Sequence, residues 1–522
     1  SQDVDVFGFW RRGEDGECVC VLANASLHDA HTVRVPMAGE AVSDVVSGAA
    51  PAAVDGCAEA FLWPLGTAVL HFHKQRRLQE PLEPGMGVLC HVTSLPNEGG
   101  PGTLGAPARR FVDWLAECGQ TYWQVLPVNP ADGYGSPYAG LAAFAGNTCL
   151  LEKDPEDVLA ELKDADDDPD YQAFLEKNKY WLTPYATFRA IKDLLGEGPW
   201  QEWPDAYARF SPGLARRVEL ADGVDRHRKL QYEFQREWDE LRAYANARGI
   251  KIVGDMPMYV SGDSADVWAE RDIFELDERG YAQVQAGCPG DGFDPEGQLW
   301  GNPTYRWDVL AARGYDWWLA RLERAVKTYD YVRLDHFIGF SSYYKIAKGK
   351  PAREGSFSFG PGLDLFRAAY QKLGPLPFIA EDLGVITPAV RALIAETGIP
   401  GMDIVQFSDG DVREGYEPKP GTVTFTGTHD NQTLGFCQSR FGLEGDEATQ
   451  MADRIAASVL GSKNDVAIMP LQDVLGLDDA ARMNVPGVAE GNWSWQAAWE
   501  DVVAATGRLA QMAQASGRFR EA

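Results

Sequence analysis

The stretch Asp330-Tyr331-Val332-Arg333-Leu334-Asp335-His336-Phe337 decides the fold. It reads as a short apolar strand that ends in a carboxylate, an imidazole and an aromatic ring. In a parallel α/β barrel, the carboxyl ends of the strands form the rim where substrate binds. We therefore expect Arg333, Asp335 and His336 to point into a site at this rim. Taken alone, the stretch would more often be an ordinary barrel strand with a capping aspartate.

Three other apolar runs also end in acidic residues. They are residues 250–254 before Asp255, residues 377–380 before Glu381, and residues 422–426 before His429 and Asp430. Four such strand ends, each followed by helix-like sequence, are what a barrel needs to gather carboxylates on one rim. The pattern predicts an α/β fold, a TIM-type (β/α)8 barrel with helical insertions.

Composition and charge indicate an uncharged substrate. The 522 residues carry 48 basic and 77 acidic side chains, a net charge of −29. This charge disfavours nucleic acid, anionic membranes and phosphorylated substrates as partners. The 16 Trp and 19 Tyr residues suit stacking against sugar rings, although most of them are expected to lie in the core.

The eight cysteines are scattered and form no Cys-x-x-Cys pair, which is typical of a reduced, cytoplasmic protein. No apolar run has the length of a membrane span, and the N-terminus lacks a signal-peptide core. No metal-ligand cluster or nucleotide-binding fingerprint occurs, so we expect no cofactor and no metal. The chain begins with Ser1 rather than Met, which fits a piece of a longer polypeptide with a further domain upstream.

The pattern of elements changes near residue 84. Residues 1–83 contain short β-rich runs separated by turn residues and predict a small β-sandwich, with a linker at residues 76–84. The order of its runs resembles the C-terminal β-domain of α-amylase-family enzymes. Residues 84–522 alternate between strands and helices, and residues 151–248 have the period of an α-helical insert beside the barrel mouth.

Two segments predict aromatic contacts to the substrate. The loop at residues 133–138 lacks the lysine and the strand-to-helix setting of a phosphate loop, so Tyr138 is expected to stack on a sugar instead. The Gly- and Pro-rich loop at residues 286–298 contains Phe293 and is followed by Trp300. We expect this loop to close over a bound substrate, with plain disorder as the alternative.

From about residue 85 to the end, the chain resembles the 4-α-glucanotransferases of the amylomaltase, or disproportionating enzyme, family. The resemblance covers more than four-fifths of the chain and runs through separate motifs. These are His91–Pro96, Ser136–Tyr138, Gly254–Val260, Asp263–Trp268, Gly297–Pro303, Arg333–Phe337, Ala380–Val385, Gly427–Asn431, Ala481–Asn484 and Gly491–Trp493.

The resemblance implies a role for each matching residue. It implies Asp335 as the nucleophile, Glu381 as the general acid/base and Asp430 as the stabiliser of the transition state. It also implies contacts to the nucleophile or the sugar for Arg333, His336, His429 and Asp255. Retaining transfer independently requires one attacking carboxylate and one protonated acid about 5 Å apart.

Some positions depart from the family pattern. They are Gln432, Gly290–Asp294, Gly355–Phe357 and Gln496. These departures bear on acceptor preference and leave the three carboxylates unchanged. The expected function is transfer of α-1,4-glucan segments between a maltooligosaccharide donor and acceptor. Hydrolysis of α-1,4-glucan with the same carboxylates is the alternative, and a non-catalytic glucan-binding protein is a third reading.

Overall fold

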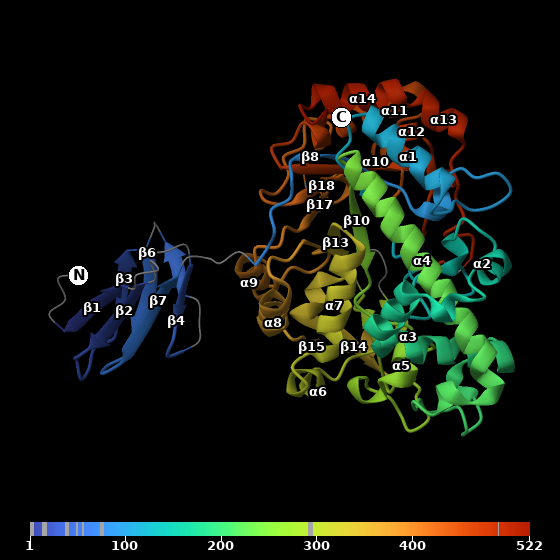
Figure 1. Ribbon diagram of the computed structural model, residues 1–522. Helices are drawn as coiled ribbons and strands as arrows, with labels where there is room; N and C mark the ends of the chain where they lie inside the picture. Colours follow the sequence, from blue (N-terminus) through green and yellow to red (C-terminus); the bar gives the residue numbers. More distant parts are fainter. Residues whose placement is uncertain are drawn as a thin grey trace. The chain divides into compact units, whose positions relative to one another are not determined.

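The computed structural model describes residues 5–12, 18–36, 41–47, 51–54, 57–73, 78–290, 296–408, 410–488 and 490–521 (Figure 1). The chain divides into two compact units, Ser1–Arg77 and Leu78–Ala522. Within the described ranges, no helix combines the length and the apolar character needed to cross a membrane.

The smaller unit consists of two antiparallel sheets. One has the order β1 (Val6–Arg12), β2 (Cys18–Asn24), β7 (Thr67–His73) and β4 (Ala41–Asp44), and the other has the order β3 (His31–Pro36), β6 (Cys57–Leu62) and β5 (Ala52–Val54). Side chains from both sheets, among them Leu70 and Phe72 of β7 and Ala58 and Leu62 of β6, form one buried core. Strand β2 alternates between buried and half-buried positions, as a strand with one face on a core should. The small all-β domain predicted from the sequence is confirmed.

The larger unit is built on a parallel sheet of eight strands. Their order is β16 (Phe378–Ala380), β13 (Tyr331–Leu334), β10 (Lys251–Met256), β9 (Tyr122–Gln124), β8 (Gly85–Leu89), β19 (Val466–Pro470), β18 (Val423–Phe425) and β17 (Met402–Ile404). A parallel bridge between Ala380 and Gly401 joins the first strand to the last, which closes the barrel. The predicted TIM-type barrel is confirmed. Strand β19 was not predicted from the sequence.

Helices surround the barrel, as Figure 1 shows for α4 and α7. The helices of the first half are α1 (Ala106–Glu117), α2 (Pro155–Glu161), α3 (Pro169–Leu195), α4 (Ala221–Ala247), α5 (Ala265–Ala269), α6 (Trp307–Ala312) and α7 (Asp316–Thr328). Those of the second half are α8 (Leu363–Leu373), α9 (Pro388–Thr397), α10 (Gly435–Phe441), α11 (Gly445–Leu460), α12 (Leu471–Leu475), α13 (Trp499–Ala504) and α14 (Thr506–Ala515). Residues 151–248 contain α2, α3 and α4, so this stretch is helical.

Helix α9 shows how local sequence sets the helix ends. The Thr387 side chain accepts a hydrogen bond from the backbone N–H of Val390, and Pro388 occupies the first turn. Gly398 ends the helix with a φ of 69°, a conformation that glycine adopts without strain.

A separate antiparallel sheet includes both ends of the Gly- and Pro-rich loop predicted at residues 286–298. Its order is β12 (Gln298–Pro303), β11 (Val284–Cys288), β14 (Ser342–Ala347) and β15 (Ser356–Phe359). The loop predicted at residues 286–298 begins within strand β11 and ends at the start of strand β12. Trp300 lies on β12.

The residues that precede the first barrel strand, from Leu78 onward, are part of the larger unit. The backbone N–H of Leu78 donates to the carbonyl of Thr397 at 3.0 Å, and the N–H of Leu376 donates to the carbonyl of Leu78 at 2.7 Å. The Leu78 side chain is buried. Residues 78–83, which are predicted to belong to the β-domain and its linker, therefore lie against the barrel in the structure.

Candidate active site

A buried guanidinium links two carboxylates at the ends of neighbouring strands. Asp255 on β10 is the register partner of Arg333 on β13. Nη1 of Arg333 donates to Oδ1 and Oδ2 of Asp255 at 2.9 and 2.7 Å, and to Oδ1 of Asp335 at 3.0 Å. Asp335 follows Arg333 by two residues, so both side chains lie on the same side of the strand. The arginine therefore fixes the position of the Asp335 carboxylate.

Glu381 lies beside Asp335 because the pairing of β13 with β16 continues past the strand ends. Leu334 is the register partner of Ala380, which places the next residue of each strand side by side. The backbone N–H of His336 donates to Oε2 of Glu381 at 2.7 Å. His336 adopts a left-handed backbone conformation with a φ of 49°, which turns the chain at this point. A tight turn thus holds the two carboxylates together.

Burial and neighbouring charges shift the pKa values of Glu381, Arg333 and His336 in different directions. Burial raises the pKa of Glu381 to about 8; the Arg333 charge opposes this shift and the Asp335 charge adds to it. Burial also acts to lower the pKa of Arg333, but the Asp255 and Asp335 carboxylates outweigh it and hold that pKa well above its usual value. Burial lowers the pKa of His336 to about 4. Near neutral pH, Glu381 is therefore protonated, Arg333 is charged and His336 is neutral.

The loop after β18 holds Asp430. Nδ2 of Asn484 donates to Oδ1 of Asp430 at 2.6 Å, and Nη2 of Arg482 donates to the backbone carbonyl of Asp430 at 2.6 Å. Nε2 of His429 lies 3.3 Å from Oδ2 of Asp430. Both oxygens of this carboxylate are therefore oriented by neighbouring side chains.

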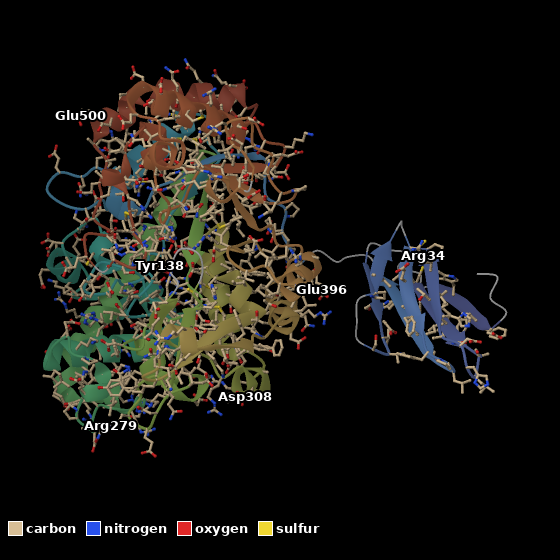
Figure 2. All side chains as sticks on the ribbon, turned by 180° about the vertical axis from the view of Figure 1, so that it is seen from behind. Arg34, Tyr138, Arg279, Asp308, Glu396 and Glu500 are labelled. Atoms are coloured by element: carbon tan, nitrogen blue, oxygen red, sulfur yellow. The ribbon has the colours of Figure 1, made fainter. Side chains whose placement is uncertain are left out.

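Tyr138 connects the Asp255 group with the Asp430 group. Its hydroxyl donates to Oδ2 of Asp255 at 2.7 Å, and its ring stacks on His429 with 5.1 Å between ring centroids and 12° between the planes. Trp493 also contacts this pair, at 5.6 Å from Tyr138 and 5.9 Å from His429. In Figure 2, Tyr138 lies near the middle of the larger unit, whereas Glu396, Asp308 and Glu500 lie at its periphery.

A second aromatic group lies around His336. The Trp300 ring is 5.0 Å from the His336 ring at 87°, and Tyr259 is 6.1 Å from Trp300 and 6.2 Å from His336. Trp300 is 37% exposed, so part of its ring is open to a ligand. One group of aromatic rings thus lies beside His336, and the other lies beside His429.

The structure brings nine of the ten predicted site residues into one network of contacts. They are Tyr138, Asp255, Trp300, Arg333, Asp335, His336, Glu381, His429 and Asp430. Phe293, the tenth, lies outside the described residues. The rim loop at residues 286–298 is described only at its two ends.

The prediction of individual site residues omitted Arg482, Asn484 and Trp493. Arg482 and Asn484 do not directly follow a strand, so only the motif at residues 481–484 marks them in the sequence. Trp493 has a φ of 64°, which is unusual for a non-glycine residue, and only the motif at residues 491–493 marks it in the sequence.

A groove of about 680 Å³ runs beside the site. Its lining includes His91, Pro137, Met483, Trp493 and Gln496. Its size is that of a small-molecule site, and His91 and Trp493 connect it to the cluster around His429. Among the residues that the structure describes, no group of three or more His, Cys, Asp or Glu side chains has the geometry of a metal site.

Comparison with known proteins gives consistent matches. The family described as 4-alpha-glucanotransferase matches residues 90–164 and 156–500. The 4-alpha-glucanotransferase of Streptococcus pneumoniae (serotype 4) is 40% identical over 471 residues, covering 78% of this chain and 92% of that protein. The Thermus thermophilus enzyme of the same name is 38% identical over 497 residues, covering 83% of this chain and 99% of that protein. The amylomaltase of Streptococcus agalactiae, solved with acarbose, superposes with a TM-score of 0.76 at 34% identity and covers 84% of this chain and 100% of that one.

Proposed function

Because the chain belongs to the 4-alpha-glucanotransferase family, we propose that it transfers α-1,4-glucan segments between maltodextrins by a retaining double displacement. The observation that carries this proposal is the pair Asp335 and Glu381, which lie on adjoining strand ends, with Glu381 protonated near neutral pH. One ionised and one protonated carboxyl group side by side are what retention requires.

In the first step, Asp335 attacks the anomeric carbon of the donor glucan. Arg333 holds the Asp335 carboxylate in position through its hydrogen bond to Oδ1. Glu381 gives its proton to the glycosidic oxygen as the bond to the leaving chain breaks. The products are a glucosyl ester on Asp335, a shortened leaving chain with a new free 4-hydroxyl, and an ionised Glu381.

In the second step, Glu381 acts as the base. It takes the proton from the 4-hydroxyl of an acceptor glucan, whose oxygen attacks the anomeric carbon and releases Asp335. Two inversions at the same carbon restore the α configuration. We assign to Asp430, whose carboxylate accepts a hydrogen bond from Asn484, the role of binding sugar hydroxyls more strongly as positive charge develops on the ring.

The aromatic side chains supply the remaining binding surface. Tyr138 and Trp493 on one side, and Trp300 on the other, offer ring faces to the apolar faces of glucose units. His336 contacts Trp300, His429 stacks on Tyr138, and both offer imidazole nitrogens for sugar hydroxyls. We also propose a cytoplasmic location, on the basis of the scattered cysteines.

The test is incubation of the protein with maltotriose. Transfer converts maltotriose into glucose and longer maltodextrins while the number of reducing ends stays constant. Asp335→Asn serves as the inactive control, because the amide cannot form the ester. A steady gain of reducing ends in the parent would assign hydrolysis instead, and binding without any turnover would assign a non-catalytic role.

A further inference from the structure

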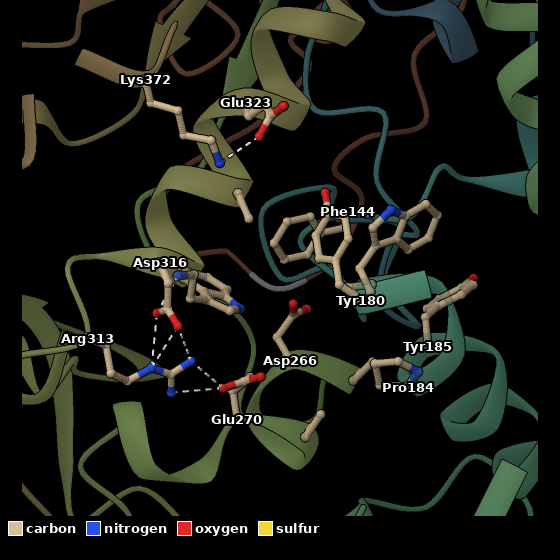
Figure 3. A pocket seen from close by; sticks show the side chains of 16 residues that line it. Phe144, Tyr180, Pro184, Tyr185, Asp266, Glu270, Arg313, Asp316, Glu323 and Lys372 are labelled. Carbon is tan, nitrogen blue, oxygen red and sulfur yellow. Dashed lines mark hydrogen bonds and ion pairs between the residues drawn. The ribbon is translucent and has the colours of Figure 1, made fainter. Parts of the chain in front are cut away.

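A second cavity lies in the larger unit, between α3, α5, α7 and α8 (Figure 3). None of the ten predicted site residues lines it. Its volume is about 420 Å³, which is within the range of small-molecule binding sites. The cavity is therefore large enough to hold a ligand of its own.

Five aromatic side chains form its walls. They are Phe144, Tyr180, Trp181, Tyr185 and Trp317. Tyr180 and Trp317 both stand perpendicular to Phe144, with centroids 5.6 Å and 5.8 Å from it. Tyr180 is 53% exposed although its four neighbours are buried. The exposed ring gives a ligand an open apolar face at the mouth of the cavity.

Asp266 supplies a buried carboxylate whose negative charge is only partly offset, by the charge of Arg321. Its side chain is 7% exposed, and its carboxylate points into the cavity in Figure 3. Oδ2 accepts a hydrogen bond from the backbone N–H of Ala143 at 2.7 Å, and no basic side chain in the described ranges forms an ion pair with it. Burial raises the pKa of Asp266 to about 6. A ligand that donates hydrogen bonds would relieve the cost of burying this carboxylate.

The remaining charged groups of the lining are paired with one another. Arg313 binds Glu270 and Asp316 at 3.0 Å each, and Lys372 binds Glu323 at 2.7 Å. With Asp266, the lining holds four acids against two bases, which repels an anion. A purely apolar ligand would leave Asp266 unsatisfied. A sugar, with apolar ring faces and hydroxyl donors, matches both features of the cavity.

We propose that this cavity is an accessory binding site for an α-glucan chain, separate from the catalytic site. The choice of glucan rests on the proposed function, in which such a chain is the substrate. A polymer bound at two places on one enzyme molecule is released more slowly, because the second contact forms at a high effective concentration. The accessory site would thus favour long glucans over maltotriose.

The test measures binding of a polymer without turnover. Asp335→Asn protein is run through native gels with and without amylopectin, and Tyr180→Ala or Asp266→Asn is added to this background. We expect the dissociation constant for amylopectin to rise about tenfold for Tyr180→Ala, the size of one aromatic contact. Asp266→Asn should weaken binding in the same direction, because the amide keeps the shape and loses the charged acceptor.

Leu194→Ala is the matched control. Leu194 lies on α3 like Tyr180, is 48% exposed and does not line the cavity. Fourteen residues of helix separate the two side chains by about 21 Å. The control should keep the parental affinity, and equal mobility in gels without amylopectin shows that each variant is folded.

Unchanged amylopectin affinity in both cavity variants would overturn the proposal. A separate assay keeps this outcome distinct from the proposed function. With Asp335 intact, Tyr180→Ala should disproportionate maltotriose at the parental rate. A parent that fails on maltotriose contradicts the proposed function, while the gels still decide the accessory site.

Discussion

Asn484 donates a hydrogen bond from Nδ2 to Oδ1 of Asp430 at 2.6 Å, although 54 positions separate the two residues in the chain. The backbone N–H of Asn484 also donates to the carbonyl of His429 at 3.0 Å. The segment that follows β19 thereby fastens the loop that follows β18. The orientation of Asp430 depends on a residue that is itself no candidate for acid or base chemistry.

Asn484→Ala should therefore lower the turnover of maltotriose while the fold remains. The carboxylate of Asp430 would lose its fixed position, and loss of one preorganised group in an active site costs about 10²-fold in kcat. Initial rates of glucose release from maltotriose measure the effect. Asn97→Ala is the control, since the exposed Asn97 side chain also donates to a backbone carbonyl, that of Pro101. If both variants keep the parental kcat, Asn484 does not position Asp430.

Glu381→Gln tests the general acid. The amide cannot protonate a glycosidic oxygen, so turnover of maltotriose should fall by about 10²–10⁴-fold. A donor whose leaving group needs no proton, such as α-glucosyl fluoride, should still form the ester on Asp335. Fluoride release and maltotriose turnover are compared for the same preparation. Equal losses on the two donors would contradict the acid role.

The raised pKa of Glu381 also predicts how activity depends on pH. The reaction needs the protonated acid, and burial raises the pKa of this group to about 8. We expect kcat/KM for maltotriose to fall on the alkaline side with a midpoint near pH 8. A profile that stays flat from pH 7 to well above this value would be inconsistent with a protonated Glu381 as the acid.

The same shift predicts a pH dependence of stability. Glu381 binds its proton more tightly in the folded chain, with a pKa of about 8 against 4.5 for the free side chain. Its contribution to the free energy of unfolding is fully present below pH 4.5 and is lost as pH rises to about 8. Glu381→Gln carries no such loss, so its Tm relative to the parent should increase between pH 5 and pH 8.

The matched control for this comparison is Glu396→Gln. Glu396 lies on the exposed side of α9, at the periphery of the larger unit in Figure 2. Its Tm difference from the parent should stay constant over the same range. A constant difference for Glu381→Gln as well would show that the pKa of Glu381 is not raised in the folded protein.

The barrel and the strand-end acids could be predicted because both depend on local sequence. An apolar run followed by an acid marks Asp255, Asp335 and Glu381 individually, and the parallel arrangement of the strands brings them together. No local signal indicated that one guanidinium nitrogen would contact both Asp255 and Asp335. That contact depends on the register between β10 and β13, which is set by the packing of the whole barrel.

Other features depend on long-range contacts that no short stretch encodes. Asn484 reaches Asp430 only because the chain turns back after β19. The run Val466–Pro470 is not predicted as a strand, although all five of its residues are buried. A short apolar run of this kind fits a buried strand or a helical segment equally well by periodicity. Leu78 lies in a polar stretch that reads as a linker, yet the structure pairs it with Leu376.

The variant Tyr138→Phe tests the hydrogen bond of the Tyr138 hydroxyl independently of the stacking of its ring. The change removes the hydrogen bond from the Tyr138 hydroxyl to Asp255 and keeps the ring that stacks on His429. A hydrogen bond to a charged group contributes about 1.5–3 kcal/mol, so kcat/KM for maltotriose should fall roughly ten- to hundredfold. Tyr134→Phe, in the same loop and 66% exposed, should leave it unchanged. A loss shared by both variants would indicate a general effect on the loop.

Two truncations test where the catalytic unit begins. A chain that starts at Leu78 keeps the backbone hydrogen bonds of Leu78 to Thr397 and Leu376, and it should retain both activity and stability. A chain that starts at Gly85 loses these bonds and the burial of Leu78, a loss of about 2 kcal/mol in apolar contact alone. Urea unfolding should therefore show a lower free energy of unfolding for the shorter chain. Equal stability would show that residues 78–84 add nothing to the barrel, and a folded but inactive chain from Leu78 would show that the β-domain contributes to catalysis.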